Sequence, residues 1–243
     1  MIITVKQLIS QSWNLYKTSI KQFIAPLSYL VLTSAIITFA TTIAALKPAL
    51  VIPALLLGCI AILALIYINL TIIMGCWNVL NSQSLNWNEL YASSYKKLGR
   101  FIFIAFVSGL IVVGGMILLI IPGIIFAIWY QFAALNQLLS DEKLTVSQAL
   151  ANSKNLVVGR WWQTLWKTIA PQIVFGFFVG LLGGVVGGLI PGSAQDFTNL
   201  TAVALENLGS IIISAIATPL LAFPTLLLYK SLKENPVATV DKN

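Results

Sequence analysis

A run of 40 residues without a charged side chain separates Arg100 from Asp141. As one helix it would be about 60 Å long, whereas the hydrocarbon core of a bilayer is about 30 Å thick. The run therefore has to double back. Because proline removes a backbone donor and glycine permits a tight reversal, the sequence predicts a corner at Ile121-Pro122-Gly123. We expect two spans, at about 101–120 and 122–139.

Four further uncharged runs are long enough to cross a bilayer: residues 23–46, 49–78, 168–190 and 209–229. Lys47-Pro48 connects the first two, and Pro191-Gly192 is the expected end of the third. Charged residues make up only 9% of the chain, against about 25% in soluble domains, so a soluble fold has too few of them to cover its surface. The sequence predicts an all-α, polytopic protein with six transmembrane helices in one domain, residues 1–235, and a short tail, residues 236–243.

The basic residues predict the orientation of these spans. Thirteen of the fourteen Lys and Arg residues fall on one side of the predicted membrane, and only Lys47 falls on the other. Since cytoplasmic loops carry an excess of Lys and Arg, we expect this side, with both termini, to be cytoplasmic. The net charge of +7 then signals topology and not nucleic-acid binding. We expect a multi-pass protein of the plasma or inner membrane.

Three similar polar segments precede the first, third and fifth predicted spans. A capping residue starts each of them, at Thr4, Asn86 and Thr145, and Gln or Glu follows three residues later, as in a capping box. Apolar residues recur at helical spacing within each segment, which predicts an amphipathic helix at the cytoplasmic interface. The pattern predicts three repeats of an interfacial helix and a transmembrane hairpin, over residues 4–80, 86–140 and 145–233.

The stretch IIPGIIFAIWYQFAALNQLLSDEKLTVSQALANSKNLVVGRWW, residues 120–162, joins a Pro-Gly corner, an apolar span, an acidic step at Asp141-Glu142 and a helix ending in Gly159-Arg160-Trp161. In these features the chain resembles the membrane-domain superfamily that contains YciC-like inner-membrane proteins and the membrane domain of some glycerophosphoryl diester phosphodiesterases. The resemblance implies a bacterial-type cytoplasmic-membrane protein and supplies no active site. With 14 residues after Tyr229, no phosphodiesterase barrel is expected.

The predicted spans contain no Asp, Glu, Lys or Arg, and Lys167 lies just before the fifth. Ionisable groups inside a membrane commonly mark ion and proton paths, so their absence does not favour coupled transport. Polar residues do enter the spans, at Asn69, Gln131 and Asn136. Two interpretations remain open for them: interhelical hydrogen bonds, each typically worth about 0.6 kcal/mol, and a polar path for a solute.

Glycines recur every four residues in the fifth predicted span, at Gly176, Gly180, Gly184 and Gly188. A face of small residues lets another helix approach closely. We expect this face to pack within the fold, and the alternatives are a homodimer seam and a flexible gate.

Aromatic and basic residues cluster just before the same span, at Arg160, Trp161, Trp162, Trp166 and Lys167. Tryptophan and basic residues are typical of the headgroup layer, where they anchor spans. The same residue types also recognise anionic lipid headgroups. Anchoring is the expected role, and headgroup recognition is the alternative.

Catalytic and metal-binding residues are scarce. The chain has no histidine and seven acidic residues, and the adjacent pair Asp141-Glu142 is not placed to act on one atom. We therefore expect no enzymatic activity, no metal ion and no cofactor. Cys59 and Cys76 lie about 25 Å apart on the second predicted span, and we expect both to be buried and unpaired.

The leading hypothesis is a non-enzymatic integral membrane protein that binds or organises lipid, or scaffolds a membrane complex, through its interfacial helices. Its partners would be membrane lipids, a second copy of the chain or another membrane protein, and no nucleic acid. One alternative is a transporter or permease-like component for a neutral or amphiphilic solute. The other is the membrane subunit of a separately encoded enzyme.

Overall fold

The structure is a computed structural model, and it describes residues 2–189 and 200–236. Pro191-Gly192 and nearly all of the predicted tail lie outside these residues. Within them the chain folds into α-helices and two short 3-10 helices, η1 (Ile20–Phe23) and η2 (Pro48–Leu50). The α-helices are α1 (Val5–Ser19), α2 (Ile24–Leu46), α3 (Val51–Leu80), α4 (Trp87–Leu118), α5 (Ile120–Tyr130), α6 (Ala133–Leu139), α7 (Val146–Val157), α8 (Trp161–Leu189) and α9 (Leu200–Glu234).

Six helical stretches of the described residues are long and apolar enough to cross a membrane, which agrees with the predicted number. They are Val5–Thr42, Val51–Leu80, Trp87–Leu118, Ile120–Leu139, Trp161–Val186 and Asn207–Glu234. The chain is therefore an all-helical, membrane-embedded, multi-pass protein.

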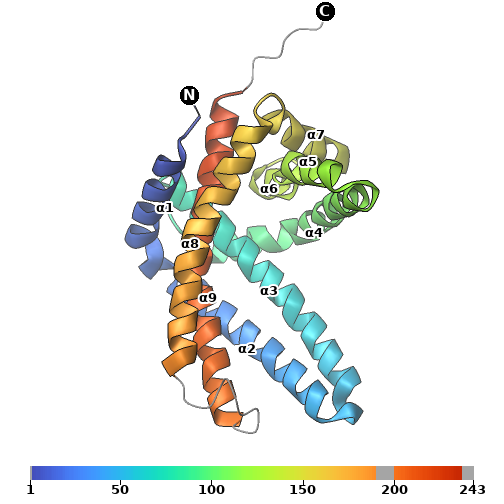
Figure 1. Ribbon diagram of the computed structural model, residues 1–243, viewed down its shortest axis with the longest axis vertical. Helices are drawn as coiled ribbons and strands as arrows, with labels where there is room; N and C mark the ends of the chain where they lie inside the picture. The colour runs from blue at the N-terminus through green and yellow to red at the C-terminus, as the bar shows by residue number, and fades with distance from the viewer. Residues whose placement is uncertain (1, 190–199, 237–243) are drawn as a thin grey trace, which may run out of the picture.

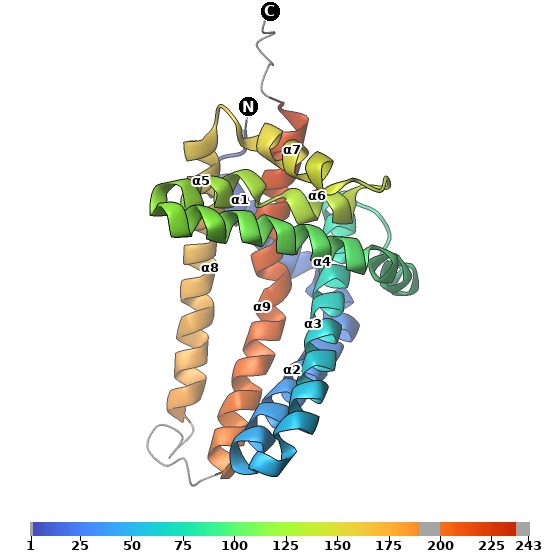
Figure 2. The ribbon, with the colours of Figure 1, turned by 90° about the vertical axis from the view of Figure 1, so that its right-hand side faces the viewer.

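The long helices do not all run in one direction. The α2–α3 and α8–α9 pairs extend along the length of the molecule (Figure 1), with α1 beside the upper part of α8 and α9. Figure 2 shows α4 and α5 running across the direction of α8 and α9. The third and fourth predicted spans thus form the expected hairpin, but this hairpin lies crosswise to the other two.

The start of α1 and the end of α9 lie close together at one end of the molecule. The backbone N–H of Ile3 donates a 3.0 Å hydrogen bond to the hydroxyl of Ser231, near the end of α9. The start of α1, the start of α8 and the last turns of α9 lie at this end (Figure 1). We call it the basic end, because these segments carry or adjoin Lys6, Arg160, Lys230 and Lys233. Lys47 instead follows α2, at the far end of the α2–α3 hairpin.

The buried core lies in the half of the molecule nearer the basic end, around the last part of α9. Phe223, Leu226 and Leu232 of α9 are almost completely buried there. Residues from most of the other helices pack into the same cluster, among them Leu8, Phe23, Ile72, Cys76 and Phe132. The outer faces of α2, α3 and α8 instead carry exposed apolar side chains, as expected of helices that contact lipid.

The corner of the crosswise hairpin lies at Leu119, where an extended residue separates α4 from α5. The predicted corner at Ile121-Pro122-Gly123 falls instead inside the first turn of α5. Proline is tolerated there, because the first turn of a helix leaves its N–H groups unbonded in any case. Gly123 matters at the reversal in a different way, because α4 approaches it closely: a Cβ atom at Gly123 would lie 2.7 Å from the backbone nitrogen of Met116.

Two of the three predicted capping boxes are confirmed. Thr4 with Gln7, and Thr145 with Gln148, make both reciprocal bonds. Asn86 instead donates from its side-chain amide to Glu89 Oε1 at 2.7 Å and does not cap α4 through its side chain.

The Gly-Arg-aromatic stretches that end the second and third polar segments adopt different structures. Gly99 is helical, so the second polar segment and the third predicted span form one uninterrupted helix, α4. Gly159 has a positive φ of 82° and separates α7 from α8. Glycine adopts this left-handed conformation without steric cost, so the chain can break at residue 159 and place Arg160 in a different environment from Arg100.

Candidate functional site

Arg160, the basic centre of the predicted aromatic–basic cluster, points inward. Its side chain is 8% exposed. The guanidinium donates to two carbonyls at the end of α9, those of Leu232, at 3.0 Å, and Asn235. Its Nε also donates to the carbonyl of Leu156 in α7, at 2.9 Å. Burial lowers the pKa of Arg160, yet a guanidinium remains charged at neutral pH. Arg160 therefore caps the negative end of α9 and is not available to a lipid headgroup.

Two lysines cap other helix ends in the same way. Lys97 Nζ donates to the carbonyls of Leu138, at 2.8 Å, and Ser140, at 2.9 Å, where α6 ends. Lys230 Nζ donates to Asn81 Oδ1 at 2.8 Å and reaches the carbonyl of Leu80 at 3.5 Å, where α3 ends. These side chains thus satisfy carbonyls that a helix terminus leaves unpaired. Sequence reasoning assigned their charges to topology alone and missed this role.

The tryptophans of the cluster divide between two environments. Trp162 and Trp166 are 72% and 59% exposed on the outer face of α8, as expected for anchors in the headgroup layer. Trp161 is half-buried against Trp162, and its Nε1 has no hydrogen-bond partner among the described residues. Lys167 is half-buried on α8. The predicted cluster is therefore not one surface.

The three polar residues proposed as a path bond to separate partners. Asn69 donates within α3 to the carbonyl of Leu65 at 2.9 Å. Gln131 accepts from the hydroxyl of Thr168 at 3.1 Å. Asn136 reaches the carbonyl of Ala149 at 3.5 Å. These bonds support structural hydrogen bonding and do not outline a path through the helices.

Asn136 also lines a cavity of about 370 Å³ at the basic end, together with the apolar side chains of Leu144 and Leu156. Amide, hydroxyl and charged side chains from α6, α7, α9 and the loop before α7 surround it: Asn136, Ser140, Glu142, Asn152, Asn155, Tyr229 and Lys233. Tyr229 and Lys233 lie far from the others in the sequence, and the sequence alone singled out only Asn136 and Glu142.

The glycine face of α8 is open. No atom of the described residues would lie within 4 Å of a Cβ placed on Gly176, Gly180, Gly184 or Gly188. The prediction that this face packs within the fold is therefore wrong for the described part of the chain. Small-residue spacing indicates that a close approach is feasible, but it does not indicate whether the partner helix belongs to the same chain.

An apolar groove of about 560 Å³ lies between α1, α8 and α9, a volume within the range of ligand pockets. Ser10 is its one hydroxyl-bearing side chain apart from the phenol of Tyr16. The remaining lining is aliphatic and aromatic: Ile9 and Trp13 of α1, Val174, Phe175, Phe178, Val179 and Leu182 of α8, and Ile213, Ile216, Ala217 and Leu220 of α9. The groove therefore fits a hydrocarbon chain and offers little to a polar solute.

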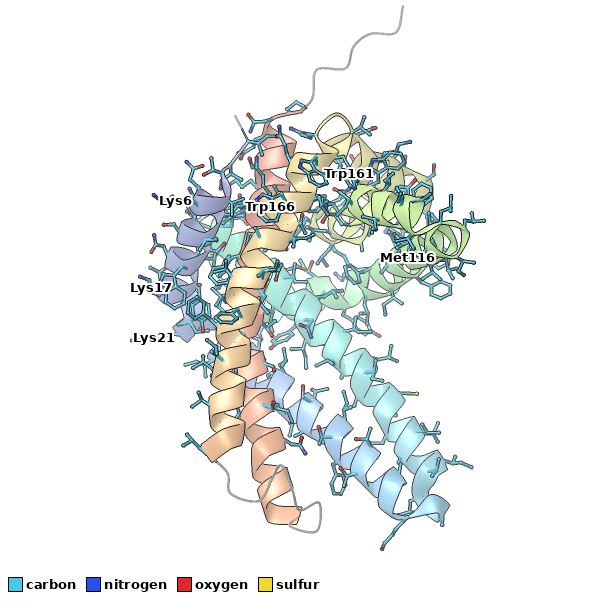
Figure 3. All side chains as sticks on the ribbon, in the orientation of Figure 1. Lys6, Lys17, Lys21, Met116, Trp161 and Trp166 are labelled. Atoms are coloured by element: carbon cyan, nitrogen blue, oxygen red, sulfur yellow. The ribbon has the colours of Figure 1, made fainter. Side chains whose placement is uncertain are left out.

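Amines lie along the helices that border this groove. Lys167 shares a face of α8 with Val174, seven residues or two turns away, so it lies about 10 Å nearer the basic end. Lys6 precedes Trp13 by the same spacing on α1, and Figure 3 shows Lys6 and Trp166 at similar heights. The amine of Lys17 lies 5.7 Å from the Trp13 ring centroid.

Two of the helices that border the groove, α1 and α8, carry lysine residues and no acidic residue. An anion near Lys6 and Lys167 would thus meet no repulsion from α1 or α8, and the acidic residues of α9 are Glu206 and Glu234, near its two ends. No group of three or more potential metal ligands occurs within residues 2–189 and 200–236. The arrangement suits an amphiphile with an anionic head and an apolar tail.

Comparison of the chain with protein-family models, with curated proteins and with solved structures gives no match.

Proposed function

We propose that the chain is a non-enzymatic protein of the plasma or inner membrane that binds an anionic phospholipid at the groove between α1, α8 and α9. The observation that carries this proposal is the apolar lining of the groove, with Lys6 and Lys167 on its bordering helices toward the basic end. One acyl chain would occupy the groove and the phosphate would lie beside the two amines. The basic end would face the cytoplasm, with both termini there.

The buried state of Arg160 changes which residues we assign to the headgroup. Lys167 stays in this role, Lys6 joins it, and Arg160 does not take part because its donors already face carbonyls of α9. Trp162 and Trp166 hold α8 at headgroup depth without contacting the bound lipid.

The experiment is native mass spectrometry of protein extracted gently with its surrounding lipid. We expect one retained phospholipid per chain and a preference for phosphatidylglycerol over phosphatidylcholine. Lys167→Gln should reduce this preference about fivefold, since a basic residue near an anionic surface contributes about 1 kcal/mol. Val174→Trp should fill the groove and abolish retention of either lipid.

Matched controls make the result specific. Ile173→Trp places the same side chain on the exposed face of α8, one residue away, and should retain lipid. Lys96→Gln removes an exposed amine from α4 and should leave the preference unchanged. Equal losses in Val174→Trp and Ile173→Trp, or a wild-type protein that retains no lipid, would overturn the proposal.

A second candidate function, scaffolding of a membrane complex, draws support from the open glycine face of α8. Phe177, Gly180, Leu181, Gly184 and Val185 line a shallow apolar groove of about 430 Å³ there. A helix from a second copy of the chain or from another membrane protein would fit such a face. Gly180→Leu should then disrupt a complex seen by cross-linking in the membrane, whereas loss of lipid at the other groove should not.

We also propose that the chain consists of three related units, each an amphipathic helix followed by a hairpin. Ser12, Ser94 and Ser153 support this organisation, because they occupy the same position of the three polar segments and all three are completely buried. Their bonding differs: Ser153 joins α7 to the α5–α6 turn, Ser94 contacts the sulfur of Met74, and the hydroxyl of Ser12 has no partner among the described residues.

A further inference from the structure

The crosswise hairpin of α4 and α5 is fixed at its base near the basic end. The hydroxyl of Ser153 on α7 donates to the carbonyl of Trp129 at 2.6 Å and accepts from the backbone N–H of Phe132 at 3.1 Å. Thr168, near the start of α8, donates to Gln131 at 3.1 Å. These bonds hold the end of α5 and the following turn against the helices of the basic end.

The length of α5 does not suit a span. It has 11 residues, about 16 Å, which is half of the hydrocarbon thickness. A turn at Gln131 and Phe132 separates it from α6, whose central residues are buried in the core. The 20-residue stretch that is apolar enough to cross a membrane is therefore bent, and its second part belongs to the protein interior.

From residue 101 onward, after the exposed Lys96 and Arg100, the surface of the hairpin is apolar all round. Ile117, Leu118, Leu119, Ile120 and Ile121 form its tip and are between 67% and 79% exposed. Along α4, Phe103, Phe106 and Leu110 are also more than half exposed, and no charged residue occurs from 101 to 140. A helix that lies on the membrane surface has one polar face. The hairpin has no such face from residue 101 onward, so the stable environment of this part is hydrocarbon.

The level of the hairpin tip along the length of the molecule indicates how deep the tip lies in the bilayer. Figure 3 places Met116, beside the tip, at a level between Trp166 and Lys21 along the length of the molecule. Tryptophan is typical of the headgroup layer, and a lysine backbone can lie somewhat deeper because its side chain extends back to that layer. A hairpin running crosswise at this level stays near one face of the membrane and does not reach the level of Lys47.

We propose that the α4–α5 hairpin is an apolar arm embedded in the acyl chains of the single leaflet at the basic end, and that α2, α3, α8 and α9 alone cross the membrane. Its partner is the lipid of that leaflet, which packs around Phe103, Leu110 and Ile120. The inference is independent of the lipid groove, because none of the groove residues belongs to α4 or α5.

The test is a depth profile of spin labels in the full-length protein, reconstituted in phosphatidylglycerol–phosphatidylcholine vesicles. Single cysteines replace Phe103, Leu110 and Ile120 in a Cys59→Ser, Cys76→Ala background. Accessibility to oxygen and to a water-soluble nickel chelate reports the depth of each label. We expect all three at similar depth, beneath the headgroups, and none reactive toward a membrane-impermeant maleimide from either side.

A transmembrane hairpin predicts a different profile, because about 25 Å of helix separates residue 103 from residue 120. Leu110 would then be deepest, with Phe103 and Ile120 shallower on opposite sides. That result, maleimide labelling of Ile120→Cys from either side, or a steady deepening from 103 to 120 would overturn the proposal. Labels at Ile52, Leu56 and Ile60, exposed on α3, are the controls and should differ in depth by up to about 12 Å.

Discussion

Arg160 and Leu232 lie 72 residues apart in the chain, and Nη2 of the first donates a 3.0 Å hydrogen bond to the carbonyl of the second. This bond and its companion to Asn235 tie the start of α8 to the end of α9. Because the groove lies between α1, α8 and α9, the contact also fixes two of its walls relative to each other. The charge at the centre of the aromatic–basic cluster thus has a structural role.

Arg160→Met is expected to lower the free energy of unfolding by about 2–4 kcal/mol, since it removes charge-assisted bonds, among them the donor to the buried carbonyl of Leu232. Thermal unfolding in detergent, followed by circular dichroism, measures the loss. Arg100→Met is the matched control, because Arg100 is exposed in the corresponding Gly-Arg-aromatic stretch, and it should change stability little. Equal effects of the two variants would contradict the capping role.

Ser153→Ala should destabilise the protein by about 1–3 kcal/mol, because the N–H of Phe132 and the carbonyl of Trp129 lose their partner at the α5–α6 turn. Ser12→Ala makes the same change at the corresponding buried position, where the hydroxyl has no partner among the described residues. It should be neutral or slightly stabilising. Chemical unfolding of both variants under identical conditions checks the difference, and a larger loss for Ser12→Ala would refute the prediction.

Local signals predicted much of the fold. Uncharged runs at 23–46 and 49–78 correspond to α2 (Ile24–Leu46) and α3 (Val51–Leu80) within two residues at each end. Two capping boxes were also predictable, since the bonding residues are three apart in the chain. The corner of the second hairpin was displaced from residues 121–123 to Leu119, because proline can both end a helix and occupy its first turn.

Contacts between distant residues were not predictable from one sequence. Arg160, Lys97 and Lys230 bond to carbonyls 41 or more residues away, and nothing near them in the chain identifies these partners. The groove combines residues of α1, α8 and α9 in the same way. Hydropathy predicted the length of the apolar run at 101–140. It did not predict that the hairpin runs crosswise to the other long helices, because this orientation depends on how the base of the hairpin packs.

The two cysteines should differ in reactivity, which corrects the expectation that both are buried. Cys59 is exposed on α3 and Cys76 is completely buried. In membranes, a lipid-soluble maleimide should modify Cys59 faster than Cys76, which should react only after unfolding. A water-soluble maleimide should modify neither in the folded protein, because Cys59 lies well inside an apolar span. Mass spectrometry of the two cysteine-containing peptides measures the extent, and rapid modification of Cys76 in the folded state would contradict the burial.

Gly123→Ala should disrupt the α4–α5 hairpin, because the added methyl would lie 2.7 Å and 2.8 Å from the backbone nitrogen and Cα of Met116. Backbone atoms cannot move aside as a flexible side chain can, so the two helices would have to separate. Overpacking of this kind typically costs about 1–3 kcal/mol, and the thermal unfolding temperature should fall accordingly.

Gly114→Ala is the control for this change, since a Cβ at Gly114 would meet no atom within 4 Å and alanine favours the helix over glycine by about 1 kcal/mol. It should leave the unfolding temperature unchanged or raise it. If Gly123→Ala were as stable as Gly114→Ala, the close approach of α4 and α5 would not exist in the folded protein. The arm would then lack the contact that keeps its two helices together, and the depth profile of labels along it would have to be measured again in that variant.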